Sequence, residues 1–130
     1  MRLLPDTSIW IEFFRGGTDA AEELDDLIER ETVFLCGPVL AELLAGVPPE
    51  RRAAVSLALG SLRFVDLERA DWRLAGEVAY ELDRRVRSVP LMDVVIAIAC
   101  RRAEARLWTR DRDFDRVRDA VPELDFYAAR

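Results

Sequence analysis

Short apolar runs alternate with longer amphipathic segments along the chain. The runs at residues 2–5, 32–36, 63–67, 107–109 and 124–127 have the length and composition of buried strands. Between them lie segments in which apolar positions recur at helical spacing, bounded by turn and capping residues. This alternation predicts a parallel sheet with helices on both faces.

Capping residues and periodicity locate the helices. Thr7 or Ser8 is expected to cap a helix that runs to Phe14, and Gly16 and Gly17 are expected to end it. Further helices are expected at residues 19–31, 38–45, 50–60, 70–87, 91–105 and 112–118. The segment 91–105 is nearly all apolar, which predicts a buried helix.

The composition favours a single folded domain over residues 1–130. With 130 residues and an apolar fraction of 51%, the chain can bury a core without disulfide bonds. Cys36 and Cys100 lie in apolar segments and are expected to be reduced core thiols. Trp10, Trp72 and Trp108 are expected in the core as well.

The absence of membrane and secretion signals predicts a cytoplasmic protein. No apolar stretch has the length of a membrane span. The first residues also lack the basic region, apolar stretch and cleavage site of a secretory signal.

The basic residues restrict the chemistry that the chain can perform. All 19 of them are Arg, and the sequence contains no Lys, His, Asn or Gln. A histidine proton relay and a Schiff-base lysine are therefore excluded, and two Cys cannot make a structural zinc site alone. The net charge of −6 argues against non-specific coating of nucleic acid. Carboxylates and hydroxyls remain for catalysis, with Arg to bind anions.

Four acidic residues stand out by their positions: Asp6, Glu42, Asp93 and Asp111. Taken singly, Asp6 and Asp111 fit helix caps, Asp93 suits a helix N-terminus, and Glu42 fits a solvent-facing position. However, Glu42 and Asp93 lie in apolar surroundings, where an unpaired buried carboxylate is costly. Asp6 and Asp111 follow predicted strands, at the edge where open α/β sheets build their sites. A bound metal is the simplest partner for these acids, and oxygen ligands favour Mg²⁺ or Mn²⁺.

The sequence resembles PIN-domain nucleases, specifically VapC-type toxins of bacterial toxin–antitoxin pairs. The resemblance lies in DTSIWIE at residues 6–12, Glu42 in its apolar helix, MDVVIAIAC at 92–100 and LWTRDRDFDRV at 107–117. It implies a PIN-like three-layer α/β fold whose central, mostly parallel sheet has about five strands. Pro5 departs from the family pattern, which more often has an apolar strand residue there, so pairing of the first strand is in question at that point.

The resemblance also implies a function and partners. It implies a cytoplasmic, Mg²⁺-dependent endoribonuclease that forms a homodimer and is inhibited by a VapB-type antitoxin. A metal ion, Mg²⁺ or Mn²⁺, would support hydrolysis of RNA phosphodiester bonds by lowering the pKa of a bound water.

Carried over by position, the acidic quartet of the family is Asp6, Glu42, Asp93 and Asp111. Asp6 and Asp93 are expected to hold the metal most directly, and Glu42 and Asp111 to act directly or through water. Asp113 is either a further acid of the site or a helix-capping residue. The general base, and the number of metal ions, are left open.

Hydroxyl and guanidinium groups are expected to assist the quartet. Thr7 and Ser8 are expected to orient Asp6 or its water, and Thr109 to support Asp111 by a hydrogen bond. Contacts to RNA phosphate are expected from Arg87, Arg110 and Arg112.

Three rival classes match parts of this pattern. A receiver-type phosphoacceptor domain also gathers carboxylates at strand ends, but it normally uses a Lys, which this chain lacks. A dehalogenase-like phosphatase would place a second Asp two residues after the first, where this chain has Ser8. A catalytically silent PIN-like module that binds RNA or protein is the alternative from another class, and the presence of all four acids favours the nuclease.

Overall fold

The computed structural model describes residues 1–85 and 88–130, in which strands and helices alternate. The strands are β1 (Leu3–Pro5), β2 (Phe34–Cys36), β3 (Arg63–Val65) and β4 (Arg106–Trp108). The helices are α1 (Thr7–Arg15), α2 (Asp19–Glu29), α3 (Gly37–Gly46), α4 (Arg52–Gly60), α5 (Arg69–Arg84), α6 (Leu91–Ala103) and α7 (Asp113–Ala120), with a 3-10 turn η1 at Pro49–Arg51. The predicted end of the helix at residue 87 lies outside the described residues.

The described strands are parallel and form two pairs, β1 with β4 and β2 with β3. A single bridge between Leu3 and Val33 joins the pairs side by side. The expectation of one sheet of about five strands is therefore corrected, because within the described part of the chain four short strands form two small sheets. The predicted fifth strand at 124–127 is reduced to one parallel bridge between Leu107 and Phe126.

Pro5 explains why the sheet divides. The N–H of Leu3 donates to Thr32 on the β2 side, and the N–H of Asp6 donates to Trp108 on the β4 side. Alternate residues of a strand direct their N–H groups to opposite neighbours, so residue 5 would donate toward β2, and proline has no N–H. Pro5 still pairs in register with Trp108, so pairing is kept toward β4 and ends toward β2.

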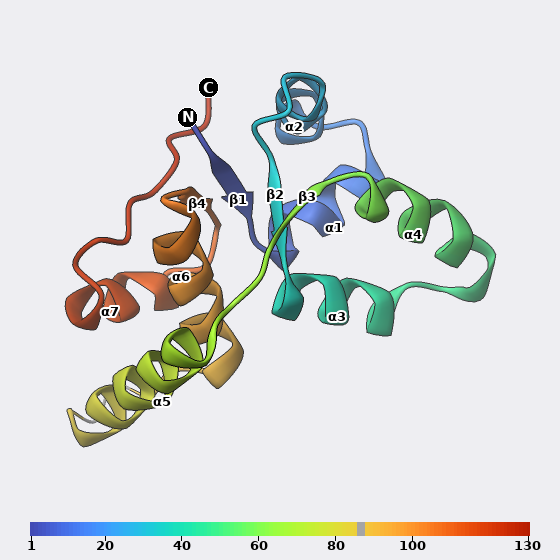
Figure 1. Cartoon of the computed structure of the whole chain (residues 1–130). Helices are drawn as coiled ribbons and strands as arrows, with labels where there is room; N and C mark the ends of the chain where they lie inside the picture. Colours follow the sequence, from blue (N-terminus) through green and yellow to red (C-terminus); the bar gives the residue numbers. More distant parts are fainter. Residues whose placement is uncertain (86–87) are drawn as a thin grey trace.

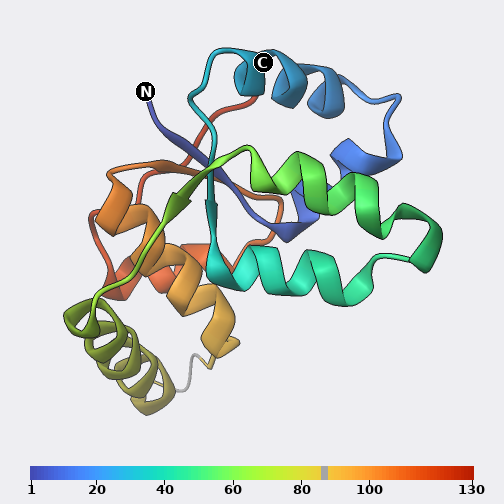
Figure 2. The ribbon, with the colours of Figure 1, turned by 45° about the vertical axis from the view of Figure 1, so that its right-hand side comes forward.

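Two groups of helices flank the strands. Helices α1–α4 pack with one another, as do α5–α7, and the two groups lie to either side of the strands in Figure 1 and Figure 2. Helix α6 is buried from Val94 to Cys100, as its apolar sequence predicts. The predicted α/β fold with helices around parallel strands is confirmed.

The core contains most of the residues predicted for it. Trp10 and Trp108 are buried, and Cys36 and Cys100 are buried free thiols. The prediction for Trp72 is wrong, because 51% of this residue is exposed. The buried face of α5 runs through Asp71, Ala75, Val78 and Leu82, and Trp72 falls one residue away from it. No described helix combines the length and the apolar character needed to cross a membrane.

Candidate metal centre

Asp6 lies between β1 and α1, where the chain turns from strand to helix. Its side chain caps α1 by accepting the N–H of Ile9 at 3.3 Å, so the expectation that Thr7 or Ser8 caps this helix is wrong. The same oxygen, Oδ1, accepts the Ser8 hydroxyl at 2.5 Å, and Oδ2 accepts the Thr109 hydroxyl at 2.5 Å. Asp6 is only 5% exposed, and these donors replace the water that burial removes.

Thr109 links Asp6 to the acids that follow β4. Its Oγ1 accepts the N–H of Asp111 at 2.9 Å while its hydroxyl hydrogen goes to Asp6. Asp111 Oδ1 in turn accepts the N–H of Asp113, the first residue of α7, at 2.9 Å. Hydrogen bonds thus connect the ends of β1 and β4 to the start of α7.

Asp93 lies in the first turn of α6, in the apolar segment that predicted a buried helix. Burial raises the pKa of Asp93 to about 6, and the charges of Asp111, Glu42, Asp113 and Asp6 add to the rise. The other acids selected from the sequence therefore lie close enough to Asp93 to raise the pKa of its carboxyl group. Such a cluster needs a cation, or a proton, to relieve the repulsion.

Glu42 lies on α3 with its side chain exposed to solvent, which corrects the expectation of an apolar environment. The apolar neighbours of Glu42 in the sequence, Val39 and Leu43, point into the core from other faces of the same helix. Glu42 Oε1 accepts the Thr7 hydroxyl at 3.2 Å, which connects α3 to the start of α1.

Three carboxylates come close enough to share one ion. In the described part of the chain, Asp93, Asp111 and Asp113 each offer an oxygen within 4.8 Å of the others. Asp6 and Glu42 stand outside this group. Asp113, whose role the sequence leaves open, therefore lies among the residues that could bind a metal. Its signal in the sequence is that it is a second Asp, two residues after Asp111.

The three arginines expected to contact RNA have different surroundings. Arg110 forms an ion pair of 2.9 Å with Glu12 on α1, a partner that the sequence does not reveal. The side chain of Arg112 is exposed and makes no hydrogen bond or ion pair with the described residues. Arg87 lies outside the described residues.

An apolar groove lies beside Glu42, between α1, α3 and α4. Its volume is about 240 Å³. It is lined by Ile11, Phe14, Arg15, Glu42, Leu43, Gly46, Val47, Pro48, Arg51 and Val55. Glu42 therefore belongs to the acidic site and to the wall of the groove at once.

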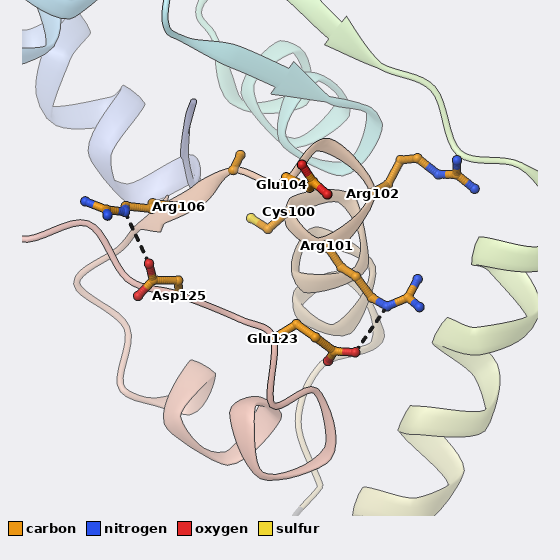
Figure 3. Close-up of a pocket in the computed structure, with 8 residues that line it drawn as sticks. Cys100, Arg101, Arg102, Glu104, Arg106, Glu123 and Asp125 are labelled. Carbon is orange, nitrogen blue, oxygen red and sulfur yellow. Dashed lines mark ion pairs between the residues drawn. The ribbon is translucent and has the colours of Figure 1, made fainter. Parts of the chain in front are cut away.

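A larger cavity, of about 570 Å³, lies at the C-terminal end of α6, and none of the candidate acids lines it. Figure 3 shows two of its arginines facing acidic partners: Arg101 pairs with Glu123 at 3.6 Å and Arg106 with Asp125 at 3.2 Å. Because Arg101 and Arg106 are paired and none of the candidate acids lines this cavity, it is a weaker candidate for a catalytic centre than the acids at the N-terminal end of α6.

Comparison with known proteins identifies the family. Residues 3–120 match the PIN domain. Ribonuclease VapC11 of Mycobacterium tuberculosis (strain ATCC 25618 / H37Rv) and VapC ribonuclease Mb1587 of Mycobacterium bovis are each 34% identical to the chain over 122 residues, covering 87% of this chain and 89% of theirs.

Solved structures share the fold. The crystal structure of VapBC2 from Rickettsia felis, bound to a promoter DNA fragment, has a TM-score of 0.78 at 22% identity and covers 98% of both chains. VapBC-1 from nontypeable Haemophilus influenzae has a TM-score of 0.76 at 20% identity, covering 98% of this chain and 97% of its own. With the motifs, the fold and these matches in agreement, the chain belongs to the PIN-domain family and, within it, is a VapC-type ribonuclease homologue.

Proposed function

We propose that this protein is a divalent-metal-dependent endoribonuclease and the toxin of a toxin–antitoxin pair. The observation that carries the proposal is the group of three carboxylates, Asp93, Asp111 and Asp113, whose oxygens lie within 4.8 Å of one another. Its relatives of 34% identity are named ribonucleases, which supports the same activity here. Residues 1–130 would act as one nuclease domain, in the cytoplasm.

The donor set fits a hard divalent cation. The group offers carboxylate oxygens without nitrogen or sulfur ligands, which suits Mg²⁺ or Mn²⁺. Asp93, Asp111 and Asp113 would hold the ion, and Asp6 and Glu42 would act through water and through their charge. When bound, such an ion lowers the pKa of a coordinated water and neutralises charge that develops on the phosphate.

The surrounding hydroxyls keep the carboxylates in place. The Ser8 and Thr109 hydroxyls donate to the two carboxylate oxygens of Asp6. Asp111 is held at its backbone N–H, which donates to Thr109 Oγ1, and at its Oδ1, which accepts the N–H of Asp113. An organised set of carboxylates lowers the reorganisation needed when the phosphate reacts.

Arginines near the acids would bind the RNA backbone. Arg112 is exposed next to Asp111, and its guanidinium, which has no partner among residues 1–85 and 88–130, is available to a phosphate. Arg110 would exchange its ion pair with Glu12 for a phosphate contact. Arg87 is retained from the sequence as a third candidate.

Metal removal tests the activity directly. Excess chelator should abolish cleavage of a structured RNA, and added Mg²⁺ or Mn²⁺ should restore it. Cleavage that persists in chelator, in preparations free of contaminating nuclease, would contradict the metal-dependent mechanism. The absence of RNA cleavage with either ion would favour the catalytically silent module.

A matched pair of variants tests the carboxylate group. Asp113→Asn should lower RNA cleavage by about a hundredfold, since loss of a residue that orients a metal costs roughly 10- to 100-fold or more. Asp115→Asn removes the same charge from the same turn of α7, outside the group, and should keep near-parental activity. Equal activities of the two variants would exclude Asp113 from the site.

The groove beside Glu42 is the proposed antitoxin site. The structural neighbours are toxin–antitoxin complexes, and the groove offers apolar walls with an acid at the catalytic end. A VapB-type segment with apolar side chains and one Arg would fill the groove and pair with the acids.

A charge placed in the groove tests the antitoxin site. Ile11→Arg should weaken binding of the cognate antitoxin at least tenfold while RNA cleavage persists, because one buried charge opposes an apolar contact. Leu57→Arg is the control, on the exposed face of α4 and outside the groove. Antitoxin binding that is unchanged in Ile11→Arg would place the antitoxin elsewhere.

A homodimer completes the proposal. Four large apolar side chains are exposed on α5 and at the start of α6: Trp72, Tyr80, Leu91 and Met92. Exposed apolar side chains of this size are typical of interaction surfaces.

A further inference from the structure

The segment after α7 lies along the free edge of β4. The N–H of Leu107 donates to the carbonyl of Asp125, and the N–H of Tyr127 donates to the carbonyl of Leu107, both at 2.8 Å. In Figure 1 this segment runs from α7 back past β4 to the end of the chain near the N-terminus. We call residues 124–130 the tail.

A buried carboxylate on α2 anchors the tail. Glu23 is 4% exposed, and its oxygens accept the Tyr127 hydroxyl at 2.5 Å and the N–H of Arg130 at 3.0 Å. The guanidinium of Arg130 also lies 3.7 Å from Glu23 and donates to Asp26 at 3.2 Å. These donors from the tail satisfy Glu23, so burial of this carboxylate depends on the docked tail.

Tyr127 also contacts the strand end from which the acidic site begins. The centroid of its ring lies 5.1 Å from the ring centroid of Trp108, the last residue of β4. The carbonyl of Trp108 accepts the N–H of Asp6, and the next residue, Thr109, holds both Asp6 and Asp111. One side chain therefore joins the buried Glu23 to the backbone that positions the acids.

The tail lines the same small cavity as the loop of the acidic site. This cavity is lined by Phe126 and Tyr127 of the tail and by residues 109–112. Repulsion among Asp93, Asp111 and Asp113 opposes their close approach in the metal-free protein, so neighbouring contacts must hold the loop near α6.

We infer that Tyr127, fixed by Glu23, is a positioning residue for the acidic site, holding the end of β4 so that Asp111 and Asp113 face Asp93. The inference rests on the proposed metal-dependent function. In this inference Tyr127 acts on the acids through Trp108 and Thr109.

The substitution Tyr127→Phe tests the inference by removing only the hydroxyl that Glu23 accepts. The apparent Kd for Mn²⁺, measured by calorimetry, should rise about three- to tenfold, the range of one hydrogen bond. Amide hydrogen exchange over residues 105–113 should become faster in the metal-free protein. RNA cleavage should need more Mn²⁺ but reach the parental kcat at saturation, which a general loss of folding would not produce.

Ser61→Ala is the control, since it removes a single hydroxyl hydrogen bond, donated to the Ala58 carbonyl at 2.9 Å at the end of α4, away from the tail. It should keep the parental Mn²⁺ affinity and exchange. If Tyr127→Phe does not fold, Glu23→Gln weakens the same hydrogen bond, because it replaces the charged acceptor of the phenol by a neutral amide oxygen. The Kd for Mn²⁺ and the exchange at 105–113 should then change in the same direction by a smaller factor.

The outcomes separate the inference from the proposed function. Parental Mn²⁺ affinity and parental exchange in Tyr127→Phe would overturn the inference, as would faster exchange with unchanged affinity. If the parent binds no Mn²⁺, the proposed function fails, and the exchange at 105–113 alone decides. Equal rates in Tyr127→Phe and Ser61→Ala overturn the positioning role, and faster rates in Tyr127→Phe support it.

Discussion

Thr109 joins the two halves of the acidic site through one hydroxyl group. It donates to the buried Asp6 and accepts the N–H of Asp111 at 2.9 Å. Serine offers the same hydroxyl, whereas valine has the same shape as threonine and no polar atom. The site therefore depends on a hydroxyl at this position more than on its bulk.

Thr109→Val should destabilise the protein by about 1–3 kcal/mol, because it leaves Oδ2 of the buried Asp6 carboxylate without its donor. RNA cleavage should fall at the same time. Thr109→Ser should recover most of both losses. Urea unfolding and a cleavage assay on the three proteins check this, and a Val variant as stable and active as the Ser variant would exclude the hydroxyl from the site.

The raised pKa of Asp93 makes the stability of the metal-free protein depend on pH. The folded pKa is about 6, whereas an unfolded aspartate has a pKa of about 3.9. Between these values the folded state binds the proton more tightly, so the contribution of Asp93 to stability is fully present below about pH 4 and is lost as the pH rises through about 6. In the parent this loss should be about 1–2 kcal/mol, after allowing for solvent screening of a half-buried group. Asp93→Asn should lack it and be at least as stable as the parent near pH 7.

Metal binding gives Asp93→Asn a second readout. Mg²⁺ at a hundredfold excess over Kd should stabilise the parent by about 2.7 kcal/mol. The variant should lose most of this increment, whereas Asp115→Asn should keep it. Melting curves with and without Mg²⁺ check the result: an equal metal-induced shift in parent and Asp93→Asn would remove Asp93 from the site.

At the scale of elements, α6 carries the acidic site at one end and a structural clamp at the other. Asp93 lies in its first turn, and Arg102 in its last turn donates to the buried Asp71 of α5 at 2.9 Å. Burial opposes the charge of Asp71, but the N–H of Glu68 and the Arg102 guanidinium outweigh it, so the pKa of Asp71 lies below its ordinary value. The clamp therefore holds α5 and α6 together as long as Asp71 is ionised.

Two arginine variants in neighbouring positions test the clamp. Arg102→Ala should lower the melting temperature by about 5 °C or more near pH 7, because it leaves a buried carboxylate with fewer donors. Arg101→Ala breaks the exposed pair with Glu123 and should lower it by about 2 °C or less. The stabilisation from Asp71 is present above the unfolded pKa of about 3.9 and is lost as the pH falls through its lower folded pKa, so the difference should shrink in acid. Equal shifts for both variants would contradict the clamp.

At the scale of the whole molecule, the net charge and the exposed apolar side chains determine how the protein can meet its partners. The net charge is −6, so we expect RNA to be held by local arginines and a bound metal, and not by attraction to the protein as a whole. The apolar side chains of α5 and the start of α6 remain uncovered in a single chain.

The proposed homodimer should be visible by sedimentation at micromolar concentration. Replacing Trp72 and Tyr80 together by Ala should raise the dimer dissociation constant at least tenfold, since each loses a large apolar contact. Leu57→Ala, on an exposed part of α4, should leave it unchanged. A parent that sediments as a monomer at micromolar concentration would contradict the dimer.

Much of the fold follows from local patterns. The alternation of apolar runs and helical segments predicted each described strand and helix, and the nearly unbroken apolar segment at 91–105 predicted that α6 is buried. Sheet division was not predicted, because it depends on which neighbour each N–H of β1 faces, and only the paired structure shows that Pro5 faces β2. Trp72 was misplaced for a similar reason: its own residue type is apolar, but the buried face of α5 is set by the helices that pack on it.

The candidate site divides in the same way. Residue type and position, with the absence of Lys and His, were enough to select Asp6, Glu42, Asp93 and Asp111 as acids and a metal as their partner. Tertiary structure decided which carboxylates approach one another, since Asp93 and Asp113 lie on different helices and their spacing is set by packing. It also decided that Glu42 is exposed, that Asp6 caps α1 itself, and that the tail docks on Glu23. The physical reason is that chemical identity and local conformation are carried by neighbouring residues, whereas burial, charge coupling and long-range hydrogen bonds exist only between segments that folding brings together.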